Sequence, residues 1–192
     1  MHCSINTNDF LVTGEKHVKL KDHPTKIKDV YKDKSDYKEL IEEFQEEIND
    51  LQRMMYAYDR YSMLLIFQAM DAAGKDGTIR AIMSGVNAHG ISVHAFKQPS
   101  AEELDHDFLW RTNIRLPQRG RIGIFNRSYY EEVLIVRVHP EIVLSSQKLP
   151  AERTKDLDAL WQDRYESIRH LANHLTQSGT TDVTFFLQLS RD

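Results

Sequence analysis

Residues 63 to 67 read Met-Leu-Leu-Ile-Phe, and residues 69 to 77 follow as Ala-Met-Asp-Ala-Ala-Gly-Lys-Asp-Gly. The first stretch has the length and the unbroken apolar character of a buried strand. After the second stretch, apolar residues recur at helical spacing: Ile79, Ile82, Met83 and Val86. A buried strand, a glycine-containing turn and an amphipathic helix in this order are typical of an α/β domain with a parallel sheet.

Other apolar runs predict the remaining elements of this domain. We expect strands near residues 63–67, 91–96, 122–125 and 183–189. Helices should occupy roughly residues 75–86, 101–116, 128–138 and 152–177. A further long helix, from about 36 to 60, is indicated by a capping pattern of Asp36 and Glu39 and by apolar residues at helical spacing. Pro140 and Pro150 should bracket a loop.

Size and charge limit the class of protein. The chain has 192 residues, enough for one compact domain, and its 25 basic and 29 acidic residues give a net charge of -4. This charge argues against a protein that coats nucleic acid. The single cysteine, Cys3, cannot form an intrachain disulfide, and the apolar runs are too short for a signal segment or a membrane span. We therefore expect a cytoplasmic protein that binds neither nucleic acid nor a membrane.

The first 34 residues are polar and rich in lysine, without helical or strand periodicity. We interpret residues 1–34 as an extended arm that precedes a domain of residues 35–192. A solvated tail and a segment that contacts a polyanion both fit this composition.

The glycine-containing turn resembles a phosphate-binding loop, although incompletely. In the pattern G-x-x-x-x-G-K-[ST], Ala69 stands at the first glycine and Asp76 at the hydroxyl residue. Gly74 lets the backbone approach phosphate oxygens, Lys75 supplies a cation, and the next helix points N–H groups at the anion. A turn without a ligand is the alternative. The expected fold is a three-layer P-loop kinase fold, and the expected phosphate-binding residues are Ala72, Ala73, Gly74, Lys75, Asp76, Gly77 and Thr78.

Two carboxylates of this loop are candidate metal ligands. A carboxylate within a phosphate-binding loop is unfavourable unless a cation or a transferable proton is near. We therefore expect Asp71 to bind a metal ion or to act as a base, with Asp76 as a second ligand for Mg²⁺. Asn126, after the third strand, brings no charge to a metal. Glu131 and Glu132 follow within a turn. One of them could instead help to hold the metal, but a position on a helix surface is the favoured interpretation.

Between residues 108 and 130 there are five arginines and no acidic residue. The planar guanidinium group pairs bidentately with phosphate, so this stretch suits a polyanionic substrate. Arg111 and Arg115 share one face of the expected helix, whereas Arg127 follows a strand. A solvated basic surface is an equal alternative for the other two, Arg119 and Arg121.

Several segments together resemble one known family. Residues 67–78 are similar to the Walker A segment of family-2 polyphosphate kinases. The other matching segments, in the family's order, are residues 106–111, 116–117, 123–131 and 136–139. The Phe-Asn-Arg-Ser sequence of residues 125–128 is most similar to the class that phosphorylates nucleoside mono- and diphosphates. The resemblance covers about residues 60 to 192.

The resemblance implies transfer of a terminal phosphoryl group from inorganic polyphosphate to AMP or ADP, or the reverse reaction from ATP, with Mg²⁺. Lys75 and the loop amides would hold phosphates, and Asp71 would bind the metal or the acceptor phosphate. Arg111 and Arg127 would bind phosphate, with Asn126 and Arg115 beside them. The catalytic residues that we expect are Asp71, Lys75 and Arg127.

Departures from the family pattern leave other functions open. Ala69 replaces a usual glycine, and the chain stops at Asp192, where the family continues into a helical lid. A kinase without a lid cannot readily exclude water. A nucleotide- or polyphosphate-binding protein with impaired catalysis is therefore an alternative, as is a nucleotide kinase that uses ATP. The long helix at 36–60 favours a homo-oligomer, either a dimer or a tetramer.

Overall fold

A single parallel sheet forms the centre of the computed structural model, which describes residues 6–14, 18–25, 27, 30–70 and 73–189. Its strands are β1 (Ser62–Ala69), β2 (Ile91–Ala95), β3 (Ile122–Asn126) and β4 (Thr180–Leu187). They lie in the order β2-β3-β1-β4, and every neighbouring pair is parallel. The α/β fold predicted from the sequence is confirmed.

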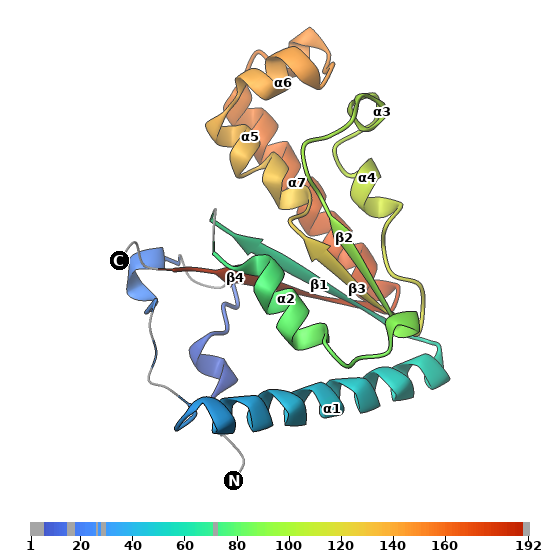
Figure 1. Cartoon of the computed structure of the whole chain (residues 1–192). Coiled ribbons are helices and arrows are strands. Elements are labelled where there is room, and N and C mark those ends of the chain that lie inside the picture. Colours follow the sequence, from blue (N-terminus) through green and yellow to red (C-terminus); the bar gives the residue numbers. More distant parts are fainter. Residues whose placement is uncertain (1–5, 15–17, 26, 28–29, 71–72, 190–192) are drawn as a thin grey trace.

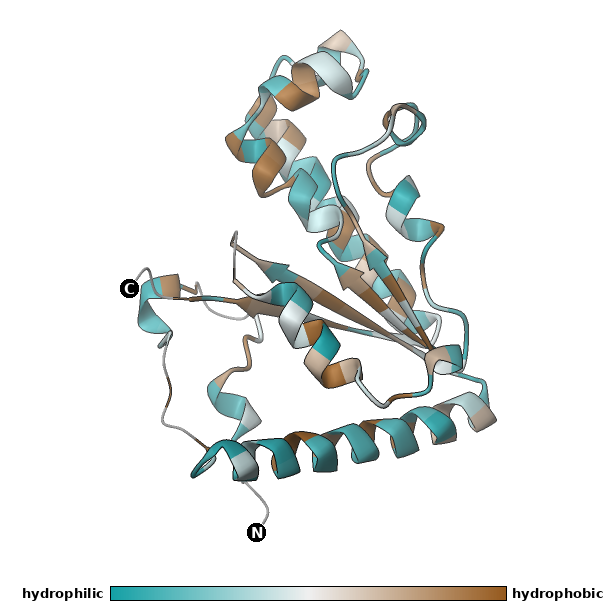
Figure 2. Cartoon of the chain, in the orientation of Figure 1, coloured by the Kyte–Doolittle hydropathy of each residue, from teal (hydrophilic) through white to brown (hydrophobic). Residues whose placement is uncertain are grey.

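Helices cover the sheet on both faces (Figure 1). The helices of the described residues are α1 (Lys34–Tyr58), α2 (Lys75–Met83), α3 (Ala101–Leu104), α4 (Trp110–Asn113), α5 (Ile135–Val138), α6 (Glu141–Ser146) and α7 (Leu157–Gln177). The side chains of α1 and α2 pack on one face, against Phe67, Ile122 and Ile124. Hydrophilic residues dominate the outer side of α1 (Figure 2), as expected for a helix with one face toward a core.

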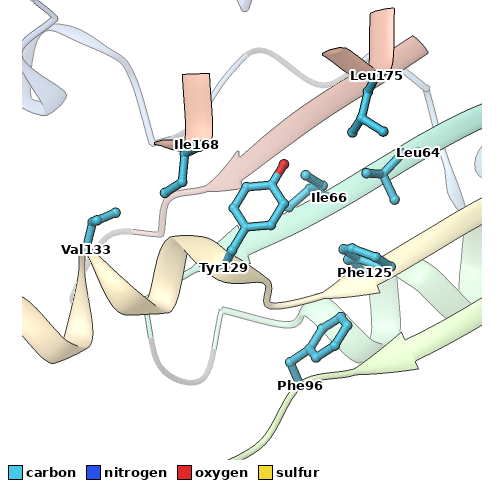
Figure 3. Close-up of a cluster of buried hydrophobic side chains, with 8 residues drawn as sticks. All are labelled: Leu64, Ile66, Phe96, Phe125, Tyr129, Val133, Ile168 and Leu175. Atoms are coloured by element: carbon cyan, nitrogen blue, oxygen red, sulfur yellow. The ribbon is translucent and has the colours of Figure 1, made fainter. Parts of the chain in front are cut away.

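The opposite face of the sheet holds a second apolar cluster. Alternate residues of β1, Leu64 and Ile66, pack there with Phe125 of β3 and with Ile168 and Leu175 of α7 (Figure 3). Each of these five side chains is 5% exposed or less. Burial on both faces explains why residues 63–67 of β1 and 122–125 of β3 carry no polar side chain.

Helix α1 begins earlier than the capping pattern predicted. Its N-cap is Asp33, whose side chain accepts hydrogen bonds from the amides of Ser35 and Asp36. The carboxylate of Asp36 instead accepts a hydrogen bond of 2.7 Å from the amide of Lys32. The helix ends at Tyr58, before a left-handed residue.

The helix expected at residues 101–116 is two short helices, α3 and α4. Between them, the Asp107 carboxylate accepts a 2.9 Å hydrogen bond from the Leu109 amide. A side chain that bonds the nearby backbone in this way competes with the helical ladder. The single helix predicted at residues 128–138 is likewise divided, into a 3₁₀ turn (Tyr129–Glu132) and α5. The expected loop between Pro140 and Pro150 contains α6.

Part of the N-terminal arm has structure. Two 3₁₀ turns form at Thr7–Asp9 and Leu20–Asp22. The side-chain amide of Gln188, just after β4, donates a 3.3 Å hydrogen bond to the carbonyl of Leu20. Within the described residues, no helix combines the length and the apolar character needed to cross a membrane.

Candidate phosphate-binding site

Gly74, in the turn between β1 and α2, has a backbone conformation that suits glycine. Gly74 is the N-cap of α2 and has a φ of 73°, in the left-handed region that favours glycine. The amide and the hydroxyl of Thr78 both bond the Gly74 carbonyl, at 3.0 and 3.2 Å. Helix α2 therefore begins just after Gly74, with Lys75 in its first turn. Asp71 and Ala72 lie outside the described residues.

The end of β3 lies beside this turn. Phe67 of β1 and Asn126 of β3 are register partners, and the Arg127 amide donates a 3.0 Å hydrogen bond to the Phe67 carbonyl. The side-chain amide of Asn126 donates to a carboxylate oxygen of Asp76. The structure therefore joins two predicted segments, the start of α2 and the end of β3, through a direct contact.

Arg127 has an unusual backbone conformation. Its φ is 63°, which costs a residue with a side chain about 1 kcal/mol or more. The guanidinium nitrogen Nη1 lies 3.5 Å from Oε2 of Glu131 in the 3₁₀ turn that follows. The side chain of Arg127 remains 41% exposed, whereas that of Glu131 is 15% exposed. Arg127 is thus accessible to a ligand while one edge of its guanidinium group faces a carboxylate.

A second group of charged side chains is buried between α4, the 3₁₀ turn at Tyr129–Glu132 and α7. Glu132, 3% exposed, lies between Arg111 and Arg164, with oxygen-to-nitrogen distances of 3.7 and 3.3 Å. Gln147 donates a 2.6 Å hydrogen bond to the same carboxylate. Burial lowers the pKa of Arg164, and attraction to Glu132 opposes that shift. The expectation that Glu131 and Glu132 lie on a helix surface is wrong, because both belong to a 3₁₀ turn packed against other elements.

These buried residues line a cavity of about 210 Å³. Arg111 is 6% exposed, and its Nη1 donates a 2.8 Å hydrogen bond to the Lys97 carbonyl. Its guanidinium carbon also lies 5.6 Å from the centre of the Phe96 ring. The structure thus places Arg111 in an internal network, and its predicted contact with phosphate stays a prediction.

The structure divides the arginine-rich stretch between two edges of the sheet. Arg127 lies at the carboxyl end of β3, but Arg119 lies near the amino ends of the strands, where its Nη1 donates a 2.7 Å hydrogen bond to the Arg60 carbonyl. Arg115 follows α4. Burial lowers the pKa of His94 in β2, and the positive charge of Arg115 adds to this shift. The five arginines are therefore not one surface.

Sequence reasoning missed one buried residue at this site. Gln68, near the end of β1, is 3% exposed and contacts the hydroxyl of Ser128 at 2.9 Å. Ser128 itself is fully buried. A polar residue inside an apolar strand was the available signal, because buried polar groups are almost always hydrogen-bonded.

Comparisons with known proteins find relatives that match most of this chain. The family model described as Polyphosphate kinase 2 (PPK2) matches residues 31–192. An ADP-polyphosphate phosphotransferase of Rhodopseudomonas palustris is 54% identical over 188 residues, which are 98% of this chain and 64% of that protein. An AMP/ADP-polyphosphate phosphotransferase of Meiothermus ruber is 41% identical over 145 residues, covering 76% of this chain and 49% of that protein.

A solved structure agrees with these relatives. The crystal structure of polyphosphate kinase 2 from Arthrobacter aurescens TC1 is similar with a TM-score of 0.77 and 33% identity, over 94% of this chain and 59% of that one. The chain therefore spans less than two thirds of the length of each of these three relatives.

Proposed function

Because the chain belongs to the polyphosphate kinase 2 family, we propose that it transfers a terminal phosphoryl group between inorganic polyphosphate and AMP or ADP. The observation that carries this proposal is the contact between the start of α2 and the end of β3 through Asp76 and Asn126. In α/β proteins with parallel sheets, ligands bind at the carboxyl ends of the strands. The names of the two relatives, an ADP-polyphosphate phosphotransferase and an AMP/ADP-polyphosphate phosphotransferase, support the substrate class.

The residues at this edge suit phosphoryl transfer, which needs positioning and charge neutralisation more than covalent chemistry. The amino end of α2 directs N–H groups toward an anion, and Lys75 adds a positive charge there. Arg127, just after the end of β3, offers a side chain that is 41% exposed. Together they would hold the phosphate groups of donor and acceptor in line.

Mg²⁺ fits the oxygen ligands at this edge. The ion usually takes one or two protein carboxylates and completes its shell with water and substrate phosphates. Asp76 is exposed in the first turn of α2, and we propose it as one ligand, with Asp71 as another. Among the described residues, no group of three or more histidine, cysteine, aspartate and glutamate side chains could hold a metal. Bound Mg²⁺ would neutralise charge on the transferred phosphoryl group.

Assembly into a homo-oligomer is part of the proposal, and the surface of α1 supports it. Four apolar side chains recur every seven residues along the helix, each at least 36% exposed: Tyr37, Phe44, Leu51 and Tyr58. Such spacing suits a helix-to-helix contact. Light scattering over a range of concentrations tests this part, and a monomer at every concentration would refute it.

The activity is tested by incubating the chain with polyphosphate, ADP and Mg²⁺ and measuring ATP. ATP formation supports the proposal, whereas saturable polyphosphate binding without ATP indicates the binding protein with impaired catalysis. In a further reaction ATP replaces polyphosphate as the donor, with AMP as acceptor. Transfer from ATP but not from polyphosphate would indicate an ordinary nucleotide kinase instead.

Lys75→Ala supplies the residue-level test of the same site. Loss of one charged contact to phosphate, about 1.5–3 kcal/mol, should weaken polyphosphate binding by about tenfold to 150-fold. Lys38→Ala, an exposed lysine of α1, is the matched control and should leave binding unchanged. Equal affinities of the two variants would remove the loop from the site.

A further inference from the structure

We propose that Glu131 is a positioning residue that orients the guanidinium group of Arg127, and that Gln68 in turn orients Glu131. The inference rests on the proposed function, in which Arg127 holds a phosphate group. It assigns a task to two side chains that lie behind the phosphate-binding residues and would not touch the substrate.

The backbone position of Arg127 is well defined, but this does not fix the orientation of its side chain. Its left-handed conformation and its hydrogen bond to Phe67 place the Cα atom beside β1. The long side chain still has several rotatable bonds, and 41% of it is exposed. The geometry in which it binds phosphate therefore depends on the side chains that contact its guanidinium group.

Glu131 provides such a contact from four residues further along the chain. Its Oε2 lies 3.5 Å from Nη1 of Arg127. With 15% of its side chain exposed, Glu131 is better shielded from water than Arg127. A guanidinium group has five N–H donors, so an arginine can contact a carboxylate and a phosphate at the same time.

Gln68 holds the other oxygen of the same carboxylate. In the amide orientation that satisfies both of its ends, Nε2 donates to Glu131 Oε1 at 2.9 Å, and the amide oxygen accepts from the Ser128 amide and hydroxyl at 3.2 and 2.9 Å. The opposite orientation would turn the amide oxygen toward the carboxylate. A continuous set of polar contacts thus runs from Ser128 through Gln68 and Glu131 to Arg127.

This arrangement should affect the rate of transfer more than the binding of substrate. Without Glu131, Arg127 keeps its charge and can still attract polyphosphate, but Nη1 loses the carboxylate that it faces and the guanidinium plane is less well fixed. A displacement of about 1 Å in a positioning group can cost about 100-fold in rate. Glu131→Gln should therefore lower kcat by about tenfold to 100-fold, while KM for polyphosphate changes by less than about threefold.

A double-mutant cycle separates positioning from a general loss of structure. In the Arg127→Ala background, Glu131→Gln should have no further effect on kcat. Additive losses in the double variant would overturn the proposal. Glu166→Gln is the matched control, because its carboxylate lies 3.5 Å from Arg169 in an ion pair whose side chains are more than half exposed. It should leave kcat unchanged.

A second readout does not depend on activity. In the unliganded chain, the guanidinium signals of Arg127 in ¹⁵N NMR should show hindered rotation, and both Glu131→Gln and Gln68→Leu should abolish it. Unchanged signals in both variants would refute the inference. Loss of hindered rotation, in a chain that forms no ATP, would sustain the inference and refute only the proposed function. If Glu131→Gln does not fold, Gln68→Leu alone carries the NMR test.

Discussion

Glu132→Ala is the perturbation whose effect on stability follows most directly from the structure. The carboxylate is 3% exposed and faces two guanidinium groups, those of Arg111 and Arg164, which are 6% and 3% exposed. It also accepts the hydrogen bond from Gln147. Truncation to alanine therefore leaves two buried positive charges near each other without their shared counterion.

The expected loss of unfolding free energy is about 3–5 kcal/mol, the usual effect of removing one partner from a buried ion pair. For a domain of this size each kcal/mol shifts Tm by about 2–4 °C, so Tm should fall by about 6–20 °C. Urea unfolding followed by circular dichroism measures the loss directly.

The control for this experiment is Glu166→Ala on the exposed side of α7. Glu166 pairs with Arg169 in solvent, and such pairs contribute about 0–1 kcal/mol. If Glu132→Ala lost no more stability than this control, the contacts of Glu132 with Arg111, Arg164 and Gln147 would not stabilise the folded state appreciably. The reasoning from burial and shared counterion would then be refuted.

Three other variants test separate features. Burial raises the pKa of Asp182, so its charged form destabilises the folded state as pH rises through that pKa. Asp182→Asn should therefore increase the unfolding free energy at pH 7 but not below the pKa of the unfolded aspartate, and parallel curves of unfolding free energy against pH would contradict this. Asn126→Asp places two carboxylates together, so the Tm of this variant should be lower than that of the parent chain without Mg²⁺. Added Mg²⁺ should raise the Tm of the variant more than that of the parent, and an equal rise would argue against a metal ion at Asp76. Gly74→Ala should lower the free energy of unfolding by about 1–2 kcal/mol, measured in urea. A Cβ atom at this position meets nothing within 4 Å, so the loss comes only from the strain of a φ of +73°, and an unchanged unfolding midpoint would contradict this.

The sheet could be predicted because its central strands leave a strong signal. β1 and β3 are buried on both faces, so residues 63–67 and 122–125 within them carry no polar side chain. Boundaries that depend on one side-chain contact were missed. Asp107 divides the predicted helix at 101–116, and Asp33 rather than Asp36 caps α1.

The candidate site was predictable where it follows the strands. Asn126 ends an apolar strand and Asp76 lies in the first turn of the helix after the neighbouring apolar strand, so their meeting at one edge could be expected. The contacts of Gln68 with Glu131 and of Arg111 with Glu132 join distant segments, and no periodicity along the chain encodes them. The arginine stretch misled for a related reason: Arg119 and Arg127 are close in sequence but separated by the length of β3.

The parallel pairing of β1 with β4 has a consequence for how the protein is made. Ser62 and Thr180, which share a buried hydrogen bond, are 118 residues apart. At about 5–20 residues per second, a ribosome needs about 6–24 s to synthesise that interval. During this time the nascent chain holds a hydrophobic strand with one unsatisfied edge, which is a template for aggregation. We therefore expect chaperones to bind the emerging polypeptide around Met63 to Phe67 until β4 leaves the exit tunnel.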